Sequence, residues 1–241
     1  MSVELRVFET ALEAAEACGA SIFSLLESAR AGRGTATLAV SGGSTPRIMF
    51  EWMARQGFDW RGVHLFWVDE RCVPIADSQS NFRLTKLALL DLIGLDPSQV
   101  HRVPVELAPD AAAAAYAGEI RRVLGLVPGE LPSFDVLQRG MGPDAHTASL
   151  FPGEPLIADQ TGIAGSVWVE KFGQHRVTLL RGVLERAVST LCLATGEDKA
   201  AALVRVLDGN EPVSDVPSKI ASPSMIWFLD RSARPTGDLR A

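Results

Sequence analysis

A carboxylate and an imidazole share a short glycine-rich stretch in the middle of the chain, FDVLQRGMGPDAHTASLFP at residues 134–152. Asp144 and His146 lie two residues apart in it, with Thr147 and Ser149 close behind. An imidazole accepts and donates protons near neutral pH, so this pair is a candidate for acid–base chemistry. His146 is one of only four histidines, and a histidine in a loop or a helix cap is the ordinary alternative.

The stretch SGGSTP at residues 41–46 has the composition of a phosphate-binding turn. It follows the apolar segment TATLAV (35–40) and precedes a helical pattern, with Pro46 suited to the first turn of that helix. Glycines let a backbone approach a ligand and hydroxyls donate hydrogen bonds to it. The candidate binding residues are Ser41, Gly42, Gly43, Ser44 and Thr45. Because the pattern is neither a P-loop nor GxGxxG, an ordinary strand-to-helix turn is the alternative.

Charged side chains follow two further apolar segments, VHLFWV at 63–68 and STLCLA at 189–194. The carboxyl ends of parallel strands meet at one edge of a sheet, so we expect these side chains to share a crevice with the two glycine turns. An ammonium group in the first turn of a helix is well placed to reach an anion there. The candidates are Asp69, Glu70 and Arg71 after the first segment, and Lys199, within TGEDK, after the second. Solvent exposure is the alternative for Glu70 and Lys199.

The elements that must position these residues alternate between short apolar runs and amphipathic segments. Helical spacing predicts helices at 9–30, 47–56, 82–93 (capped by Ser80 or Asn81), 111–126 and 183–187, one after Gly196, and a short one that begins at Thr147 or Ala148. Apolar runs predict strands at 35–40, 63–68, 100–105, 134–139, 166–172, 176–180, 189–194 and 225–229. This order is typical of a three-layer α/β fold, a mainly parallel, Rossmann-like sheet with helices on both faces. We expect residues 1–241 to form a single domain.

The overall composition argues against some classes of partner and favours one type of cellular compartment. The formal net charge of −6 argues against nucleic acid and anionic membrane as partners. Three cysteines without metal-ligand spacing, Cys18, Cys72 and Cys192, favour free thiols in a reducing compartment. Residues 1–30 lack the pattern of a signal peptide, and no apolar run reaches the ~18–20 residues of a membrane span. We therefore expect a cytoplasmic protein.

Six motifs occur in the order in which the 6-phosphogluconolactonase family has them, and the chain resembles that family over nearly its full length. They are LAVSGGSTP (38–46), FWVDERCVP (66–74), SNFRL (80–84), FDVLQRGMGPDAHTASLFPG (134–153), RVTLL (176–180) and TGEDKA (195–200). The resemblance implies the fold shared with glucosamine-6-phosphate deaminases and ribose-5-phosphate isomerases. It also implies hydrolysis of 6-phospho-D-glucono-1,5-lactone to 6-phospho-D-gluconate in the oxidative pentose phosphate pathway, without metal or organic cofactor. We expect a monomer or a weak homodimer.

The resemblance also assigns roles to individual residues. His146 would be the general base that activates water against the lactone carbonyl, and its imidazolium could then protonate the departing ring oxygen. Asp144 would orient His146 or bind sugar hydroxyls, which Asp69 could also contact. Arg71 would stabilise either the oxyanion or the phosphate. The phosphate clamp would consist of Ser41, Gly42, Gly43, Ser44, Thr45, Arg176 and Lys199.

The chain departs from the family pattern close to these residues. Ala145 stands where the family favours glycine, and a left-handed backbone there would cost an alanine roughly 1–2 kcal/mol. Gln138 and Arg139 lie in a strand that the family keeps apolar, and a buried, unpartnered Arg139 would be costly unless the strand end opens into the crevice. Arg181 also departs from the usual run after the strand at 176–180.

These departures keep a second class of protein open, a catalytically weakened sugar-phosphate-binding protein. A sugar-phosphate isomerase or deaminase of the same fold is the other rival, although the residues that follow His146 differ from those of the deaminases. A serine hydrolase is disfavoured because the GxSxG elbow is missing from the sequence. Cys72, beside Arg71, could be a nucleophile, but a bystander thiol is the simpler interpretation.

Overall fold

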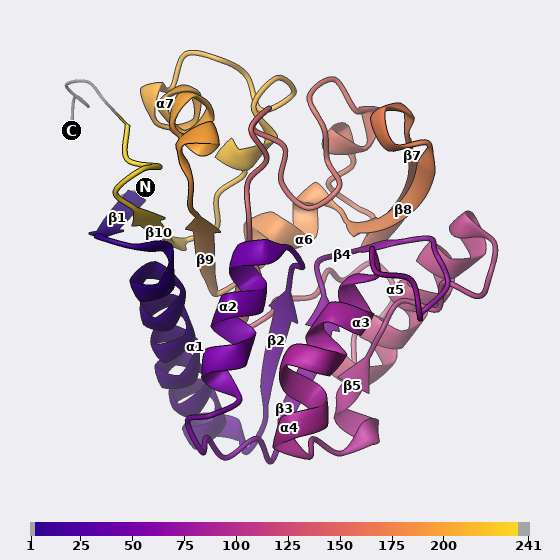
Figure 1. The fold of residues 1–241 in the computed structure, drawn as a ribbon. Helices are drawn as coiled ribbons and strands as arrows, with labels where there is room; N and C mark the ends of the chain where they lie inside the picture. Colours follow the sequence, from indigo (N-terminus) through magenta and orange to yellow (C-terminus); the bar gives the residue numbers. More distant parts are fainter. Residues whose placement is uncertain (1–2, 236–241) are drawn as a thin grey trace.

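Parallel strands form the central sheet of the molecule (Figure 1). The computed structural model describes residues 3–235 of the 241. In that part the sheet has seven strands in the order β1-β10-β9-β6-β2-β3-β5, and every neighbouring pair is parallel. The predicted α/β class with a mainly parallel sheet is therefore confirmed. The strands are β1 Val3–Phe8, β2 Ala36–Val40, β3 Val63–Trp67, β5 Val100–His101, β6 Val136–Arg139, β9 Ser189–Ala194 and β10 Ser224–Asp230.

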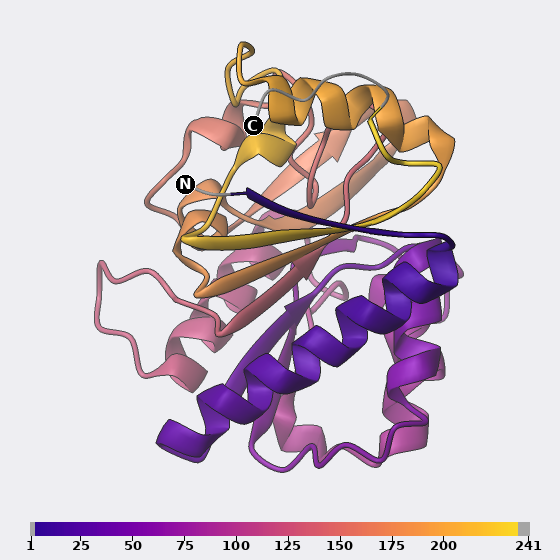
Figure 2. The ribbon, with the colours of Figure 1, turned by 90° about the vertical axis from the view of Figure 1, so that its left-hand side faces the viewer.

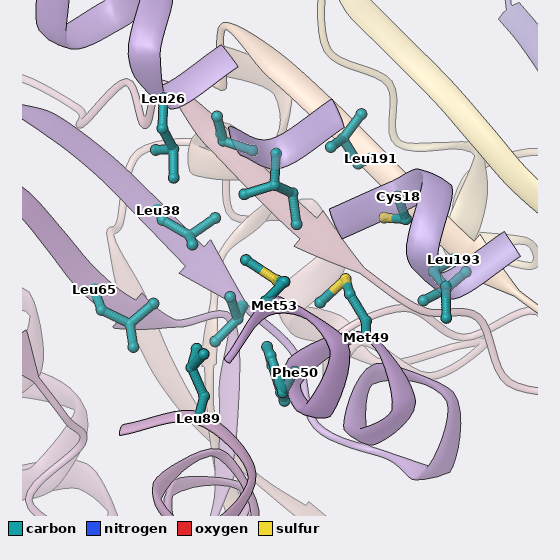
Figure 3. Packing of buried hydrophobic residues seen from close by; sticks show 14 of the residues in the cluster. Cys18, Leu26, Leu38, Met49, Phe50, Met53, Leu65, Leu89, Leu191 and Leu193 are labelled. Atoms are coloured by element: carbon teal, nitrogen blue, oxygen red, sulfur yellow. The ribbon is translucent and has the colours of Figure 1, made fainter. Parts of the chain in front are cut away.

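Helices cover both faces of this sheet, as predicted. On β9, the side chains of Leu191 and Leu193 join one buried cluster, whereas Cys192 and Ala194 join another, because successive side chains of a strand point to opposite faces. The first cluster lies under helices α1 (Ala11–Arg33) and α2 (Ser44–Met53), and Figure 3 shows its strand leucines against the side chains of those helices. Helices α5 (Pro109–Leu124), α6 (Arg181–Arg186) and α7 (Ala200–Asp208) pack on the other face. Figure 2 shows α1 and α7 on opposite sides of the sheet.

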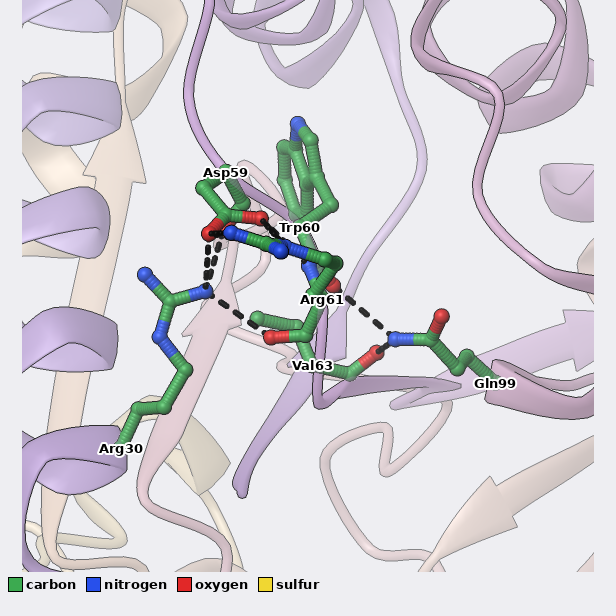
Figure 4. A network of polar contacts seen from close by, with 6 residues as sticks. All are labelled: Arg30, Asp59, Trp60, Arg61, Val63 and Gln99. Carbon is green, nitrogen blue, oxygen red and sulfur yellow. Dashed lines mark hydrogen bonds and ion pairs between the residues drawn. The ribbon is translucent and has the colours of Figure 1, made fainter. Parts of the chain in front are cut away.

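Helix α1 shows how local sequence fixes an element and its position. Thr10 and Glu13 form a capping box at its start, and Gly34, with φ +78°, ends it. Near that end the Arg30 guanidinium donates to the carbonyl oxygens of Asp59 and Arg61, which ties the helix to the turn before β3 (Figure 4). This network lies at the amino-terminal ends of the strands, away from the turns that carry the candidate residues.

A second, antiparallel sheet was not predicted. It consists of β4 (Asp69–Arg71), β8 (Gln174–Leu179) and β7 (Ala164–Val169) in the order β4-β8-β7. The charged residues after β3 are therefore not a strand tip or a turn but a short strand of their own. Three residues are too few to show the alternating pattern of a strand in the sequence. This strand forms because it pairs with β8.

Other element boundaries also differ from the predicted ones. Strand β1 was not predicted, and the strand expected at 100–105 is reduced to β5. The helix expected at 82–93 begins at its predicted cap, Ser80, but is divided into α3 (Asn81–Thr85), a π-helical turn (Lys86–Leu90) and α4 (Asp91–Ile93). Short 3₁₀ turns cover Pro97–Gln99, Pro155–Ala158, Glu170–Phe172, Glu197–Lys199 and Pro217–Lys219. Within residues 3–235, no helix is long and apolar enough to cross a membrane.

Candidate active site

A cavity of about 220 Å³ opens at the carboxyl edge of the central sheet, where it meets the antiparallel sheet. Its lining contains seven of the predicted site residues, namely Ser41, Gly42, Asp69, Arg71, His146, Arg176 and Lys199. The sequence-based expectation that separate strand ends converge on one crevice is met by this arrangement. Gly43, Ser44, Thr45 and Asp144 lie next to these residues in the chain without lining the cavity.

The SGGSTP turn joins β2 to α2 and meets the conditions for binding an anion. Gly43, with φ +124°, is the N-cap of α2, and no side chain caps that helix, so its first amides are left for a ligand. Gly42 is required by space, since a Cβ there would lie 2.0 Å from Oδ1 of Asn81. The Ser41 hydroxyl is buried and has no hydrogen-bond partner among the described residues.

The TGEDK turn is connected to the SGGSTP turn by a hydrogen bond. Thr45 Oγ1 and Thr195 Oγ1 are 2.7 Å apart, which holds the two turns side by side. Lys199 lies in the 3₁₀ turn directly before α7, close to the position expected from the sequence, and its Nζ is 2.7 Å from Oδ2 of Asp198. Gly196, with φ +97°, makes the bend, and its N–H donates to the Asp230 carboxylate over 3.0 Å.

Two arginines face each other across the antiparallel sheet beside the cavity. Arg71 on β4 is the direct register partner of Arg176 on β8. Like charges directly opposite one another destabilise a strand pair unless an anion lies between them. Burial lowers the pKa of Arg176, although the Asp69 carboxylate opposes this shift. In both guanidinium groups the Nε atom is buried without a hydrogen-bond partner in the described structure, so this pair is poised to bind an anion.

The carboxylate and the imidazole of the central motif are in direct contact. His146 Nδ1 lies 2.5 Å from Oδ1 of Asp144, which also accepts a hydrogen bond from the His146 amide over 3.2 Å. Partial burial opposes ionisation of Asp144, but the hydrogen bonds and charge of His146 outweigh it and hold the pKa of Asp144 well below its usual range. Gly142 makes room for the pair, because a Cβ there would lie 2.0 Å from His146 Nδ1.

The loop around His146 is not the helix entry that the sequence predicted. Residues 147–152 form turns with a single bridge between Thr147 and Leu150, because Ala148 has φ +54° and cannot continue into a helix. Tertiary partners bind the polar groups instead: Thr147 Oγ1 donates to the Gly140 carbonyl, and Thr178 Oγ1 accepts from the Ser149 amide. The prediction that a helix begins at this turn is therefore wrong.

The backbone at Ala145 is left-handed, with φ +66°. This is the conformation in which alanine is less favourable than the glycine that the family favours at this position. Ser218 stabilises it from the carboxyl-terminal part of the chain. The Ser218 amide donates to the Ala145 carbonyl over 3.0 Å, and its hydroxyl donates to the His146 carbonyl over 3.0 Å. Ser218 thus fixes the carbonyl groups of the alanine and of the histidine that follows it.

Arg139 is buried and does not reach the crevice, which the sequence had left as one possibility. It is 1% exposed, does not line the cavity, and donates from Nη2 to the carbonyl oxygens of Ile220 and Ser218. Its guanidinium therefore binds the same segment that holds the His146 loop. Gln138, also buried, accepts from the Ser41 amide over 3.2 Å, and Arg181 pairs with Glu185 on the surface of α6.

Three polar residues order the site through contacts that the sequence did not reveal. Asn81 lines the cavity and donates to the Asp69 carbonyl over 2.9 Å, while the Ser149 hydroxyl donates to the Asp69 carboxylate over 2.7 Å. Glu70, which is 2% exposed, accepts hydrogen bonds from the amides of Asn81 and Phe82 and so caps α3. The sequence shows Asn81 in the motif SNFRL and Ser149 three residues after His146. It does not show that both of them bind Asp69.

The thiols of the chain take no visible part in the site. All three cysteines are unpaired, as predicted. Burial, with a further contribution from the Glu70 charge, raises the pKa of Cys72 to about 11, which argues against a nucleophilic thiolate. Among the described residues, no group of three His, Cys, Asp or Glu side chains could hold a metal ion.

A larger cavity of about 740 Å³ lies at the opposite, amino-terminal edge of the sheet. It contains none of the predicted site residues, and one of its two arginines, Arg33, is already paired with Asp135, whose carboxylate also binds Thr37. The smaller cavity is the candidate active site because the SGGSTP turn, the arginine pair and His146 with its partner Asp144 meet there.

Comparison with known proteins agrees with this architecture. The family described as glucosamine-6-phosphate isomerases/6-phosphogluconolactonase matches residues 9–227. A 6-phosphogluconolactonase of Treponema pallidum is 39% identical over 208 residues, which cover 85% of each chain, and one of Synechocystis is 35% identical over 206 residues, which cover 83% of this chain and 84% of the relative. The crystal structure of 6-phosphogluconolactonase from Thermotoga maritima superposes with a TM-score of 0.83 at 25% identity, over 95% of this chain and all of the other.

Proposed function

This chain belongs to the family of glucosamine-6-phosphate isomerases and 6-phosphogluconolactonases, and we propose that it hydrolyses 6-phospho-D-glucono-1,5-lactone to 6-phospho-D-gluconate in the oxidative pentose phosphate pathway. One observation carries the proposal: the His146–Asp144 pair and the cations Arg71, Arg176 and Lys199 gather at a single cavity. A base beside a cationic anion-binding site is what a phosphorylated lactone requires. We also propose that the protein acts in the cytoplasm as a monomer or a weak homodimer.

The geometry of the pair indicates which nitrogen acts as the base. An ionised Asp144 can only accept a hydrogen bond, so in the neutral imidazole the proton would lie on Nδ1 of His146, and Nε2 would have the lone pair that a base needs. In the proposed reaction Nε2 takes a proton from a water molecule as its oxygen bonds to the lactone carbonyl carbon. The tetrahedral oxyanion then collapses, the bond to the ring oxygen breaks, and the imidazolium returns its proton to that oxygen.

The phosphate end of the substrate is assigned to the first amides of α2, the Ser41 hydroxyl, Arg176 and Lys199. Each of these groups offers an N–H or O–H donor at the carboxyl edge of the sheet. Asp69 is positioned for sugar hydroxyls, since Asn81 and Ser149 fix it at the cavity wall. Arg71→Lys would decide the role of Arg71: a higher KM assigns it to the phosphate and a lower kcat to the oxyanion.

The alternative of a weakened binding protein rested on Ala145, Gln138, Arg139 and Arg181, of which Ala145 lies next to the proposed base. A positive φ costs an alanine roughly 1–2 kcal/mol. The hydrogen bonds that Ser218 and Gly142 form with the loop offset this strain and keep the loop in place. The His146–Asp144 contact of 2.5 Å is intact in that loop, so this geometry favours an active base.

The experiment compares three proteins on 6-phosphogluconolactone, with the spontaneous rate subtracted. His146→Ala should lower kcat by about 10²- to 10⁴-fold, the usual contribution of a general base. The matched control is His175→Ala, since His175 is an exposed histidine outside the cavity lining, and it should keep the parent rate. Equal activity of His146→Ala and the parent would overturn the assignment of the base.

A further inference from the structure

An exposed aromatic side chain lies against a buried cation of the site. Phe172 ends the 3₁₀ turn Glu170–Phe172 in the β7–β8 hairpin, and 47% of its surface is exposed. Its ring centroid is 4.8 Å from Cζ of Arg176, which lines the cavity and is only 5% exposed. The exposed ring therefore covers a cation that is itself shielded from solvent.

Arg176 lacks the partners that usually fix a buried guanidinium. Within residues 3–235 it forms no ion pair with a carboxylate at contact distance, and its Nε has no hydrogen-bond partner. Two aromatic rings face it instead: Phe172, and Phe151 with its centroid 5.6 Å from Cζ. The electron-rich face of an aromatic ring attracts a cation, and more strongly where water is excluded. The orientation of Arg176 therefore depends on these rings.

The inner ring of this arrangement also contacts the proposed base. Phe151 stacks on the His146 imidazole, with ring centroids 4.3 Å apart and planes 29° from parallel. The rings of Phe151 and Phe172 are 6.3 Å apart. Phe151, Phe172 and Arg176 thus contact one another beside the His146 imidazole, and Phe151 connects this group to the base. Phe172 is the exposed member of the group, and its ring contacts Phe151 and Arg176.

We propose that Phe172 is a positioning residue that holds Arg176 at the cavity for the phosphate group of the substrate, and thereby favours phosphorylated over unphosphorylated lactones. The inference rests on the proposed function, because it assigns Arg176 to the phosphate. Without the Phe172 ring the guanidinium keeps only the more distant contact with Phe151, and the phosphate must then order it on binding. The free energy needed to order Arg176 then weakens binding of the phosphate group. It does not change the base, its carboxylate or the attack of water.

The same hairpin supplies a matched control. Trp168 is 48% exposed, like Phe172, but it lies on the other face of the hairpin, where its ring meets His175 at 5.0 Å. His175 and Arg176 are neighbours on β8, so their side chains point in opposite directions. A change at Trp168 tests whether the hairpin as a whole matters, while a change at Phe172 tests the contact with Arg176.

The experiment measures kcat and KM of the parent, Phe172→Leu, Phe172→Tyr and Trp168→Leu on 6-phosphogluconolactone and on glucono-1,5-lactone. Phe172→Leu should raise KM for the phosphorylated lactone about 3- to 30-fold, the range expected for a cation–aromatic contact, with kcat unchanged within about twofold. Its kcat/KM on the unphosphorylated lactone should equal that of the parent. Phe172→Tyr, which keeps the aromatic face, and Trp168→Leu should match the parent on both substrates.

Other outcomes separate this inference from the proposed function. An unchanged KM in Phe172→Leu, an equal loss on both lactones, or the same KM rise in Trp168→Leu would overturn the positioning role. If the parent does not hydrolyse 6-phosphogluconolactone, the proposed function fails on its own. Calorimetric titration with 6-phosphogluconate then still tests the contact: Phe172→Leu should bind it more weakly than Phe172→Tyr, and equal binding, or binding by none of the proteins, would refute the role.

Discussion

A methyl group added at position 142 would strike the pair of side chains on which the proposed chemistry depends. In Gly142→Ala the new Cβ would lie 2.0 Å from His146 Nδ1 and 2.6 Å from Asp144 Oδ1, so the imidazole has to move by more than about 1 Å to make room. A displacement of that size commonly costs a reaction about 10²-fold. We therefore expect kcat on 6-phosphogluconolactone to fall by about 10²-fold or more.

Gly140→Ala is the matched control, because Gly140 lines the same cavity. A Cβ there would meet only the Leu193 carbonyl oxygen, at an ordinary distance of 3.7 Å. Neither glycine has a positive φ, so alanine is compatible with the backbone at both positions. Gly140→Ala should keep kcat within about threefold of the parent, and thermal unfolding should show both variants folded. The reasoning is refuted if Gly142→Ala keeps most of its activity or if Gly140→Ala loses as much.

Two further predictions follow from the residues around this pair. Folding lowers the pKa of Asp144, so its contribution to stability is present above the usual titration range of a carboxyl group and is lost as the pH falls. Asp144→Asn should thus be less stable than the parent near neutral pH, with the difference in denaturant midpoint shrinking below about pH 4; a difference independent of pH would contradict this. Arg139→Met should change the free energy of unfolding by less than about 2 kcal/mol, because two of the guanidinium nitrogens have no partner in the described structure. It should lower kcat severalfold by loosening the segment that holds the His146 loop, and an unchanged kcat would disconnect Arg139 from the site.

Much of the site could be predicted from the sequence because strand ends carry local signals. Glycines and hydroxyl side chains mark the turn after β2 in the sequence. The polar residues after β3, β6 and β9 directly follow apolar runs that form strands. Once the sheet is parallel, its carboxyl ends share one edge, and convergence follows without any knowledge of side-chain contacts. The helix cap at Ser80 was predictable for the same local reason.

The remaining features depend on contacts between residues far apart in the chain. The strand at 69–71 exists only because β8, about a hundred residues later, pairs with it. In the turns after His146, the Ser149 amide donates to Thr178 Oγ1, 29 residues later, and the buried Arg139 donates to carbonyl oxygens at 218 and 220. Local propensity contains none of these partners, so it predicted a helix after His146 and left the surroundings of Arg139 open.

The central claim is that this chain, with alanine at position 145, is an active lactonase. The most direct test measures the hydrolysis of 6-phosphogluconolactone near neutral pH by the parent and by Ala145→Gly, each against the spontaneous rate. Since the His146–Asp144 contact is already formed in the alanine loop, we expect clear turnover by the parent and a change of less than about threefold in the variant. Turnover that appears only in Ala145→Gly, or in neither protein, would contradict the claim.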